Sequence, residues 1–354
     1  MADGIIWCPH CGKPHALRDR FCGQTGLPLE QRLHRLGSAS SLGRAPAPHP
    51  LIGKIIDRKY RITRHLGGGG NGQVFAAENL VLNLQVAIKV VSARRTDALV
   101  RLRREAMMIA AVQHPNICVV HDIGTMPDGS PYVVLERLFG DTLRQRLRAE
   151  RGLSARTAAD WFGQLLAGLH AAHLQRILHR DLTPQNVFIV HRLGGVHLVK
   201  LVDFGFAKDM SLTRGNPITE PGHACGSPHY MSPEQMRVEK LDARSDLFAV
   251  GVLLFESLTG QHPFAAAYAI ETQRRILEEP APPLRSVRPS LSRSLEAVVA
   301  RALAKDREDC FSTALSFRSA LEAAVEEERT RESTAPRSSG PVRRIRQSSS
   351  PSPR

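Results

Sequence analysis

The alternation of apolar and polar positions divides the chain into a strand-rich part followed by a helix-rich part. Between residues 53 and 136, short apolar runs alternate with turn signals, which is typical of an antiparallel sheet. One stretch interrupts this pattern with apolar residues at helical spacing: Leu99, Leu102, Ala106 and Ile109. Thr96 or Asp97 would cap the start of this helix. The pattern predicts a small sheet accompanied by one helix.

From residue 139 onward the apolar spacing is mainly helical. Ser154 is placed to cap a helix with three large apolar residues on one face: Trp161, Leu165 and Leu169. Residues 247–255 are apolar on all sides, and a helix of this kind is normally buried in the centre of a domain. We therefore expect an α+β fold in which a small sheet precedes a larger helical part.

The two ends of the chain differ in composition from its middle. Residues 1–36 are rich in Cys, His and Gly, and residues 37–52 form a Ser, Pro and Ala linker without periodicity. The main domain is expected at residues 53–325. Residues 326–354 form a basic tail rich in Ser and Pro, which cannot bury enough apolar surface to offset its ordering entropy. We expect this tail to be disordered.

The net charge of +14 is a property of many proteins that bind nucleic acid or anionic surfaces. Here the charge is spread out, with one basic cluster in residues 94–104 and another in residues 337–354. A basic tail is more often a solvated extension than a specific binding element. Aromatic residues make up only 5% of the chain, too few to interleave with the basic residues as stacking platforms. Nucleic acid is therefore not an expected partner.

Hydrophobic residues make up 42% of the chain, which is ordinary for a globular protein. The longest apolar run, residues 247–255, is too short to span a membrane, and no charged and then apolar leader opens the chain. The six cysteines do not form a disulfide framework, because three lie close together near the N-terminus and three are scattered. We expect a cytoplasmic protein with reduced thiols.

Five short motifs follow one another in a fixed order: GGGGNG at 67–72, VAIK ending at Lys89, HRDLTPQN at 179–186, DFG at 203–205 and SPE at 232–234. Each motif alone is weak, but the ordered set is specific. It resembles the protein kinase signature from about residue 60 to about residue 321, in the form of bacterial Hanks-type serine/threonine kinases. The resemblance implies a two-lobed kinase fold, with an antiparallel sheet and one helix in the N-lobe and a mainly helical C-lobe.

The resemblance also implies an activity. It predicts transfer of the γ-phosphoryl group of MgATP to Ser or Thr hydroxyls of protein substrates, and autophosphorylation on the activation segment. Thr213, Thr219 and Ser227 are the hydroxyl candidates in that segment, and Arg180 is placed to bind a phosphate on it. The GSPHYMSPE stretch favours Ser or Thr over Tyr as the acceptor, with Ser227 reaching the catalytic aspartate.

The glycine-rich motif supplies Gly67, Gly69 and Gly72, followed by Val74. A dinucleotide fold would place a helix directly after these glycines, but a strand-like segment follows instead. This order predicts a hairpin whose backbone amides cover the ATP phosphates. The alternative for the loop alone is an ordinary flexible turn.

Lys89 lies in an apolar strand, where its ammonium needs a charged partner to offset desolvation. Glu105 on the predicted helix is the expected partner, and the resemblance makes this pair the one that positions the nucleotide phosphates. The alternative is that Glu105 is a solvated helix carboxylate paired with Arg101.

The resemblance assigns the chemistry to three further residues. Asp181 orients the attacking hydroxyl and accepts its proton, while Asn186 and Asp203 supply oxygen ligands to magnesium. The expected nucleotide contacts outside the lysine and the metal ligands are Leu66, Gly67, Gly69, Gly72, Val74, Ala87 and Phe188, with backbone contacts from Glu136 and Leu138.

Other positions match supporting residues of the family. Leu135 stands at the back of the expected nucleotide site, and Asp246 matches the residue that braces the catalytic loop. An internal apolar column is expected from His179, Phe204, Ile109 and Val120, although simple core packing explains these residues equally well.

Two departures from the family pattern stand out. Thr183 occupies the position of a lysine that stabilises the transferring phosphoryl group, so slow activity is expected, and Lys208 is a candidate substitute. Cys310 replaces an arginine that pairs with the glutamate of the SPE motif, so Glu234 needs another partner, for which Arg307 is a candidate. A rival interpretation is a weakly active or inactive pseudokinase scaffold that recruits partners through its two ends.

The segment CPHCG followed by FCGQTG resembles a small zinc ribbon. Cys8, Cys11 and Cys22 are clear thiolate ligands, and Thr25 stands where a fourth cysteine would be expected. The candidates for the fourth ligand are His10, His15 and His34. A segment this poor in apolar residues would scarcely fold without metal, so zinc is expected, together with a partner protein at this ribbon. The alternative is an unliganded flexible arm.

Overall fold

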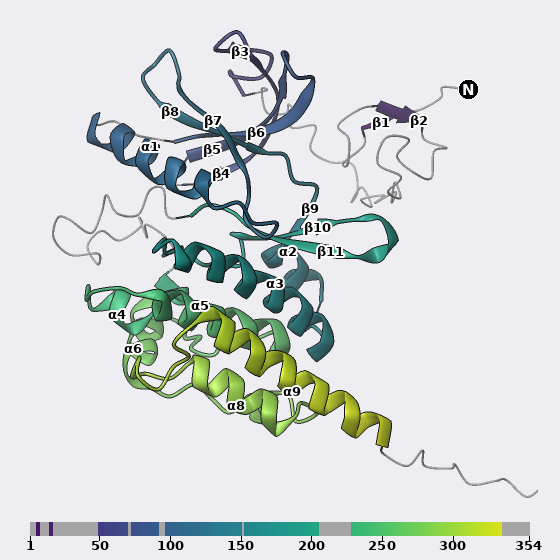
Figure 1. The fold of residues 1–354 in the computed structure, drawn as a ribbon, viewed down its shortest axis with the longest axis vertical. Coiled ribbons are helices and arrows are strands. Elements are labelled where there is room, and N and C mark those ends of the chain that lie inside the picture. Colours follow the sequence, from purple (N-terminus) through teal and green to yellow (C-terminus); the bar gives the residue numbers. More distant parts are fainter. Residues whose placement is uncertain are drawn as a thin grey trace, which may run out of the picture.

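The computed structural model describes residues 5–7, 14–16, 49–69, 72–91, 96–150, 152–204 and 228–334. Figure 1 shows the described chain as a sheet with one helix above a larger group of helices. Near the N-terminus, strands β1 (Ile5–Trp7) and β2 (Pro14–Ala16) pair antiparallel. The N-terminal cysteines, residues 205–227 and residues 335–354 lie outside the described residues.

The upper lobe contains a six-stranded antiparallel sheet with the order β3-β4-β5-β6-β8-β7. Its strands are β3 (Ile55–Ile56), β4 (Tyr60–Gly69), β5 (Gly72–Asn79), β6 (Leu84–Val90), β7 (Val120–Thr125) and β8 (Pro131–Glu136). Helix α1 (Thr96–Ala111) follows β6 and contacts β7 and β8. The predicted antiparallel sheet with one helix is therefore confirmed.

Successive side chains of the strands point to opposite sides of the sheet, and both faces carry apolar residues. On β8, Tyr132 and Val134 belong to a cluster on the outer face, together with Phe75 and Ile88 of the neighbouring strands. The residues between them point the other way, because side chains alternate along a strand. Those residues form a second cluster that faces the lower lobe and includes Ala87, Val133, Leu135, Leu102 of α1 and Cys118.

The lower lobe is mainly helical. Its helices are α2 (Leu143–Ala149), α3 (Ala155–Leu174), α4 (Pro233–Met236), α5 (Ala243–Thr259), α6 (Ala269–Glu278), α7 (Leu284–Val287), α8 (Arg293–Ala302) and α9 (Ala314–Thr334). A three-stranded sheet with the order β11-β10-β9 lies between these helices and the upper lobe (Figure 1). Its strands are β9 (Gly140–Thr142), β10 (Val187–His191) and β11 (His197–Leu201).

Two helices of the lower lobe form as their sequences predict. Ser154 is the N-cap of α3, and its hydroxyl accepts a hydrogen bond from the amide of Thr157 at 3.0 Å. Every residue of α5 from Ser245 to Leu258 is buried, which explains why this helix is apolar on all sides. Gly260 ends α5 with a left-handed φ of 74°, a conformation that glycine adopts without steric cost.

Packed or helical residues lie on both sides of the expected limits of the main domain. Leu51 and Ile52, in the expected linker 37–52, pack against the outer cluster of the sheet. Helix α9 continues to Thr334, past residue 325, and Ala324 is its last buried apolar residue among those whose burial is described. The expected disordered tail therefore begins with helical residues.

In the parts of the chain that are described, no helix is both long enough and apolar enough to cross a membrane. The cytoplasmic location stays a prediction of the sequence. Cys118 and Cys310 are buried free thiols, as ordinary packing of these cysteines predicts.

One half-buried histidine of the lower lobe, His262, is held in its neutral form. The Nε2 of His262 lies 2.9 Å from the carbonyl oxygen of His229, and its Nδ1 accepts the amide of Phe264 at 3.2 Å. Burial lowers the pKa of His262 to about 4. Protonation of Nδ1 would break the bond to Phe264 and place a charge inside the lobe.

We predict that His262 makes the domain less stable in mild acid. Its folded pKa of about 4 lies below its unfolded value of about 6.5, so the unfolded chain binds the extra proton between these values. The stabilisation is complete above pH 6.5 and is lost as the pH falls toward 4. Urea unfolding at pH 7 and pH 5 should show a decrease of up to about 2 kcal/mol from this residue. In His262→Asn this part of the decrease should disappear. An identical pH dependence in both proteins would contradict the prediction.

Candidate active site

A buried ion pair joins the two lobes at the centre of the candidate site. Lys89 is on the inner face of β6, and Asp203 lies two residues beyond the end of β11. The Nζ of Lys89 is 2.8 Å from Oδ1 of Asp203, and the lysine side chain is 9% exposed. The carboxylate thus offsets the desolvation of a lysine in an apolar strand. The expected partner Glu105 lies on α1, but its side chain is outside the described residues, so the Lys89–Glu105 pair stays a prediction.

The catalytic loop is held by one buried carboxylate at the start of α5. Asp246 accepts the amide of His179 at 2.8 Å and the amide of Arg180 at 2.9 Å, and the Nε2 of His173 lies 2.8 Å from it. Burial opposes the charged carboxylate, but the hydrogen bond from His173 and the nearby donors outweigh it. The pKa of Asp246 consequently lies below its usual value. Asp246 therefore stays ionised and braces the loop, as expected from the sequence.

Two non-glycine residues of the site have left-handed backbones. Arg180 has a φ of 63° and Asp203 a φ of 60°, a region that side chains other than Gly, Asn and Asp rarely adopt. Both backbone groups of Arg180 are fixed, because Asp246 binds its amide and the side chain of Gln235 donates to its carbonyl at 2.8 Å. Such strain persists only where the surroundings hold it, and it is typical of functional loops.

Asn186 connects the catalytic loop to Asp203. Its side-chain amide donates to the carbonyl of Asp181 at 2.8 Å, and its own carbonyl accepts the amide of Val202 at 3.0 Å. The structure therefore places Asp181, Asn186 and Asp203 together. Because the amide nitrogen of Asn186 is bound to the protein, its oxygen is the atom offered to a ligand. This oxygen and the Asp203 carboxylate form a donor set that fits magnesium.

The residues expected to contact the nucleotide gather around the inner apolar face of the sheet. Ala87 and Leu138 are buried in one cluster, and Val74 and Phe188 pack against it. Leu66, Gly67 and Gly69 are on β4, opposite the start of β5. Gly72 has a φ of 131°, and a Cβ here would come within 2.2 Å of the Val90 carbonyl. This glycine lets the β4–β5 hairpin approach β6 closely.

His179 belongs to the packing beneath the site rather than to its chemistry. Its ring centroid lies 4.5 Å from that of Phe204, and its Nε2 lies 3.1 Å from the carbonyl oxygen of Val202. Burial lowers the pKa of His179, so the ring is neutral. Phe204 and Ile109 share one core cluster, and Val120 packs against it. This arrangement agrees with the expected column and equally with simple core packing.

The SPE motif is held differently from the expectation. Glu234 is buried, and its carboxylate accepts the hydroxyl of Ser245 at 2.5 Å. The suggestion that Arg307 pairs with Glu234 is wrong, because Arg307 lies on the surface and binds Glu239 at 3.2 Å. A serine hydroxyl on the adjacent helix α5 thus replaces a cationic partner.

Sequence reasoning missed a polar network beside this motif. The hydroxyl of Tyr230 donates to Glu256 at 2.6 Å and accepts from Arg144 at 2.7 Å, while Arg144 also pairs with Glu256 at 3.2 Å. This network ties α2, α5 and the turn before α4 together. The tyrosine of GSPHYMSPE was the available signal, because a tyrosine in a polar segment needs a partner for its hydroxyl when buried.

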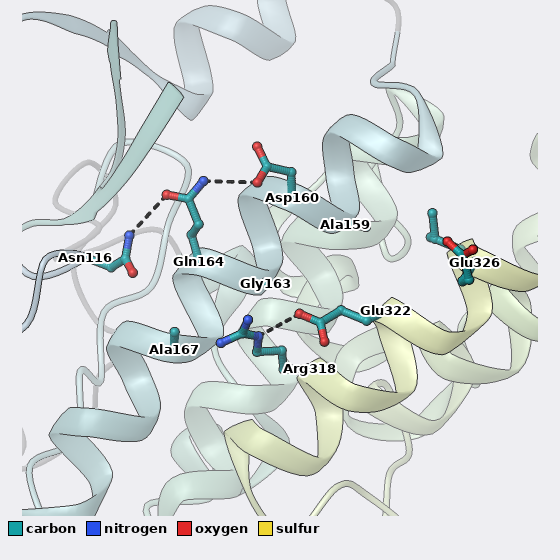
Figure 2. A pocket seen from close by; sticks show the side chains of 10 residues that line it. Asn116, Ala159, Asp160, Gly163, Gln164, Ala167, Arg318, Glu322 and Glu326 are labelled. Carbon is teal, nitrogen blue, oxygen red and sulfur yellow. Dashed lines mark hydrogen bonds and ion pairs between the residues drawn. The ribbon is translucent and has the colours of Figure 1, made fainter. Parts of the chain in front are cut away.

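A cavity of about 410 Å³ lies away from these residues, between α3 and α9. Figure 2 shows its polar lining, in which Arg318 binds Glu322 and Gln164 connects Asn116 with Asp160. No residue of the predicted catalytic, nucleotide or metal set is among those that line it. The candidate active site is therefore the region around Lys89, Asp181 and Asp203.

The comparison with known families agrees with this geometry. A model of the protein kinase domain matches residues 60–322. The chain belongs to the protein kinase family. The two-lobed kinase fold expected from the motifs is thus confirmed, and nothing in the comparisons supports the pseudokinase alternative.

Three curated relatives of the kinase domain are bacterial proteins. The serine/threonine-protein kinase pkn3 of Myxococcus xanthus is 39% identical over 84% of this chain and 55% of its own length. PrkC of Bacillus subtilis is 35% identical over 80% of this chain and 43% of its own length. PknB of Mycobacterium tuberculosis is 36% identical over 75% of this chain and 43% of its own length. The chain spans about half the length of these relatives.

We predict that Asp246→Asn destabilises the kinase domain and disorders the catalytic loop. The asparagine would turn an N–H group toward backbone donors that the carboxylate now accepts, at a cost of about 3 kcal/mol. Urea unfolding measures this loss. As a control, Asp242→Asn changes the exposed N-cap of the same helix and should cost less than about 1 kcal/mol. Equal losses in the two variants would contradict the role of Asp246.

Proposed function

We propose that this protein is a serine/threonine protein kinase that transfers the γ-phosphoryl group of MgATP to Ser or Thr hydroxyls of proteins. The observation that supports this proposal is the Lys89–Asp203 ion pair between the lobes, together with the loop in which the Asn186 side chain binds the Asp181 backbone. A lysine, a carboxylate base and two oxygen ligands are the groups that phosphoryl transfer requires. The names of the relatives support Ser and Thr as acceptors.

Each residue has a distinct role in this proposal. Asp181 accepts a hydrogen bond from the substrate hydroxyl, orients it and takes its proton as the oxygen attacks phosphorus. Asn186 and Asp203 would hold magnesium through oxygen atoms, and Lys89, beside Asp203, would bind phosphate oxygens. Bound MgATP supplies the transferable phosphoryl group, and its metal neutralises part of the charge on that group. Leu66, Val74, Ala87 and Phe188 are proposed to enclose the base.

Two sequence features affect transfer to the acceptor hydroxyl: Thr183 in the catalytic loop and the threonines of the activation segment. Thr183 is buried beside the catalytic loop, and its carbonyl accepts the amide of Asn186 at 3.0 Å, so the missing family lysine is replaced by a neutral structural residue. We expect slower transfer as a result. Autophosphorylation at Thr213 or Thr219 is proposed from the sequence, since these residues lie outside the described ranges.

The decisive test is incorporation of labelled phosphate from MgATP into the protein itself and into casein. Asp181→Asn should reduce the initial rate by about a hundredfold or more, because the general base is lost. Nucleotide binding, measured by the thermal shift with MgADP, should persist in this variant. Phosphoamino acid analysis should find phosphoserine or phosphothreonine. Equal incorporation by wild type and variant would reveal a contaminating kinase, and no incorporation by either would overturn the proposal.

We also propose that the N-terminal segment is a zinc-binding module that docks a partner protein. Strands β1 and β2 form a hairpin, and Cys8 and Cys11 fall in the connection between them. Two cysteines only three positions apart in the sequence, with Cys22 further along, supply soft thiolate donors that suit zinc. This arrangement supports the proposal, while the ligand atoms themselves lie outside the described residues.

Zinc content of the full chain tests this proposal. After dialysis against a mild chelator, mass spectrometry of the metals should find about one zinc per wild-type chain. Replacement of both Cys8 and Cys11 by Ser should remove it, whereas the control Cys310→Ala, which changes a buried thiol of the helical lobe, should retain it. A zinc-free wild-type protein would contradict the proposal.

A further inference from the structure

A second buried lysine, Lys200, lies close to the site and has no role in the mechanism above. It is on β11, three residues before Asp203, and its side chain is 8% exposed. Its Nζ lies 2.5 Å from Oε1 of Glu136 and donates to the carbonyl of Ile117 at 3.2 Å. A buried ammonium is costly unless oxygen atoms compensate it, and here two acceptors do so.

The partner of Lys200 is located where the lobes are joined. Glu136 is the last residue of β8, and the chain passes from there into the lower lobe. Its carboxylate also accepts the amide of Val119 at 2.8 Å, and its own amide donates to the Val119 carbonyl at 2.9 Å. The backbone amide and the side-chain carboxylate of Glu136 are both bound to the segment that precedes β7.

That segment is itself attached to the lower lobe. Ile117 forms a parallel bridge with Leu201, supported by hydrogen bonds from the Cys118 amide to the Leu201 carbonyl and from the Leu201 amide to the Asn116 carbonyl. The side chain of Asn116 donates to Gln164 of α3 at 3.2 Å, a contact that Figure 2 shows directly. Residues 116–119 therefore form a fixed link, and Lys200 is the charged group that connects this link to Glu136.

The Lys200–Glu136 ion pair lies between the backbone expected to contact the base and the strand that leads to the metal ligand Asp203. On one side, Glu136 begins the backbone stretch that reaches Leu138, and the sequence predicts that the backbone of these two residues contacts the nucleotide. On the other side, β11 leads directly to Asp203, which the proposed function assigns to magnesium. A change in the Lys200–Glu136 distance would shift the base contacts relative to the metal ligand, and small shifts of this kind weaken binding strongly.

We propose that Lys200 is a positioning residue for nucleotide binding, acting through Glu136 to hold the base-contacting backbone in register with the strand that carries Asp203. This inference rests on the proposed function, because it requires that the nucleotide bind at this junction. A buried ion pair contributes little net stability compared with apolar packing, so its expected effect is on geometry.

The test compares four variants of the full chain. Lys200→Met keeps the length of the side chain and removes the charge, and Glu136→Gln keeps the shape of the partner. The third variant combines the two substitutions. Lys305→Met is the matched control, because Lys305 is also partly buried and also binds backbone carbonyls, but within the helical lobe. The measurements are the Kd for MgADP by calorimetry, the KM for ATP, kcat and the melting temperature.

Lys200→Met should raise the Kd for MgADP and the KM for ATP by about tenfold while kcat changes by less than about twofold. Glu136→Gln should also raise the Kd for MgADP and the KM for ATP. The double variant should bind MgADP no more weakly than Lys200→Met does, since the two residues act as one unit. Lys305→Met should lower the melting temperature and leave nucleotide affinity unchanged. If Lys200→Met does not fold, Glu136→Gln carries the test.

Two results would overturn the proposal. The first is a melting temperature that falls as in Lys305→Met with an unchanged Kd in both Lys200→Met and Glu136→Gln, which would make the ion pair purely structural. The second is tighter nucleotide binding in these variants, which would show that the pair restrains the site. A wild-type protein that binds MgADP but transfers no phosphate would contradict the proposed function alone, because the binding comparison would still be measurable.

Discussion

The arrangement of the site depends on the carboxylate of Asp246, which is buried at the start of α5 and still ionised. A charge inside a lobe is tolerated only when donors surround it, and here the donors are backbone amides of the catalytic loop. The apolar helix α5 is therefore attached to the polar loop that contains His179 and Arg180. The left-handed backbone of Arg180 is compatible with this attachment because Gln235 holds the other side of the same residue.

In the upper lobe, the two apolar faces of the sheet stabilise the lobe, and the inner face forms the upper wall of the site. The outer cluster of the sheet provides stability, and its inner cluster presents small and apolar side chains toward the lower lobe. Lys89 is a buried polar residue on that inner face, and Asp203 neutralises it from the other lobe. The same chemistry recurs at Lys200 and Glu136, so two lysines in apolar strands each find a carboxylate across the junction.

The sequence predicted the helices and motifs that depend on local spacing along the chain. The Ser154 cap of α3, the buried helix α5 and the helix of the sheet lobe were predicted from a capping residue and apolar spacing, because these local patterns indicate where a helix starts and which of its faces are buried. Side-chain partners were harder to predict. Lys200 gave the same signal as Lys89, a lone lysine in an apolar strand, but no motif pointed to Glu136. Arg307 was proposed as the partner of Glu234 because it lies close to Cys310 in the sequence, but the carboxylate of Glu234 binds the hydroxyl of Ser245. Composition alone gave no sign that Leu51 and Ile52 pack on the sheet or that α9 continues to Thr334.

The link formed by residues 116–119 has a mechanical consequence. This segment is bonded to β11 and α3 and also leads into β7, so it attaches the upper sheet to the lower lobe. In the order of the strands, β7 and β8 lie nearest to this attachment, and β5 and β4 lie progressively farther away, at about 4.8 Å for each strand. The β4–β5 hairpin therefore lies several strand spacings from the attachment, which fixes the position of β8 more directly than the position of the hairpin.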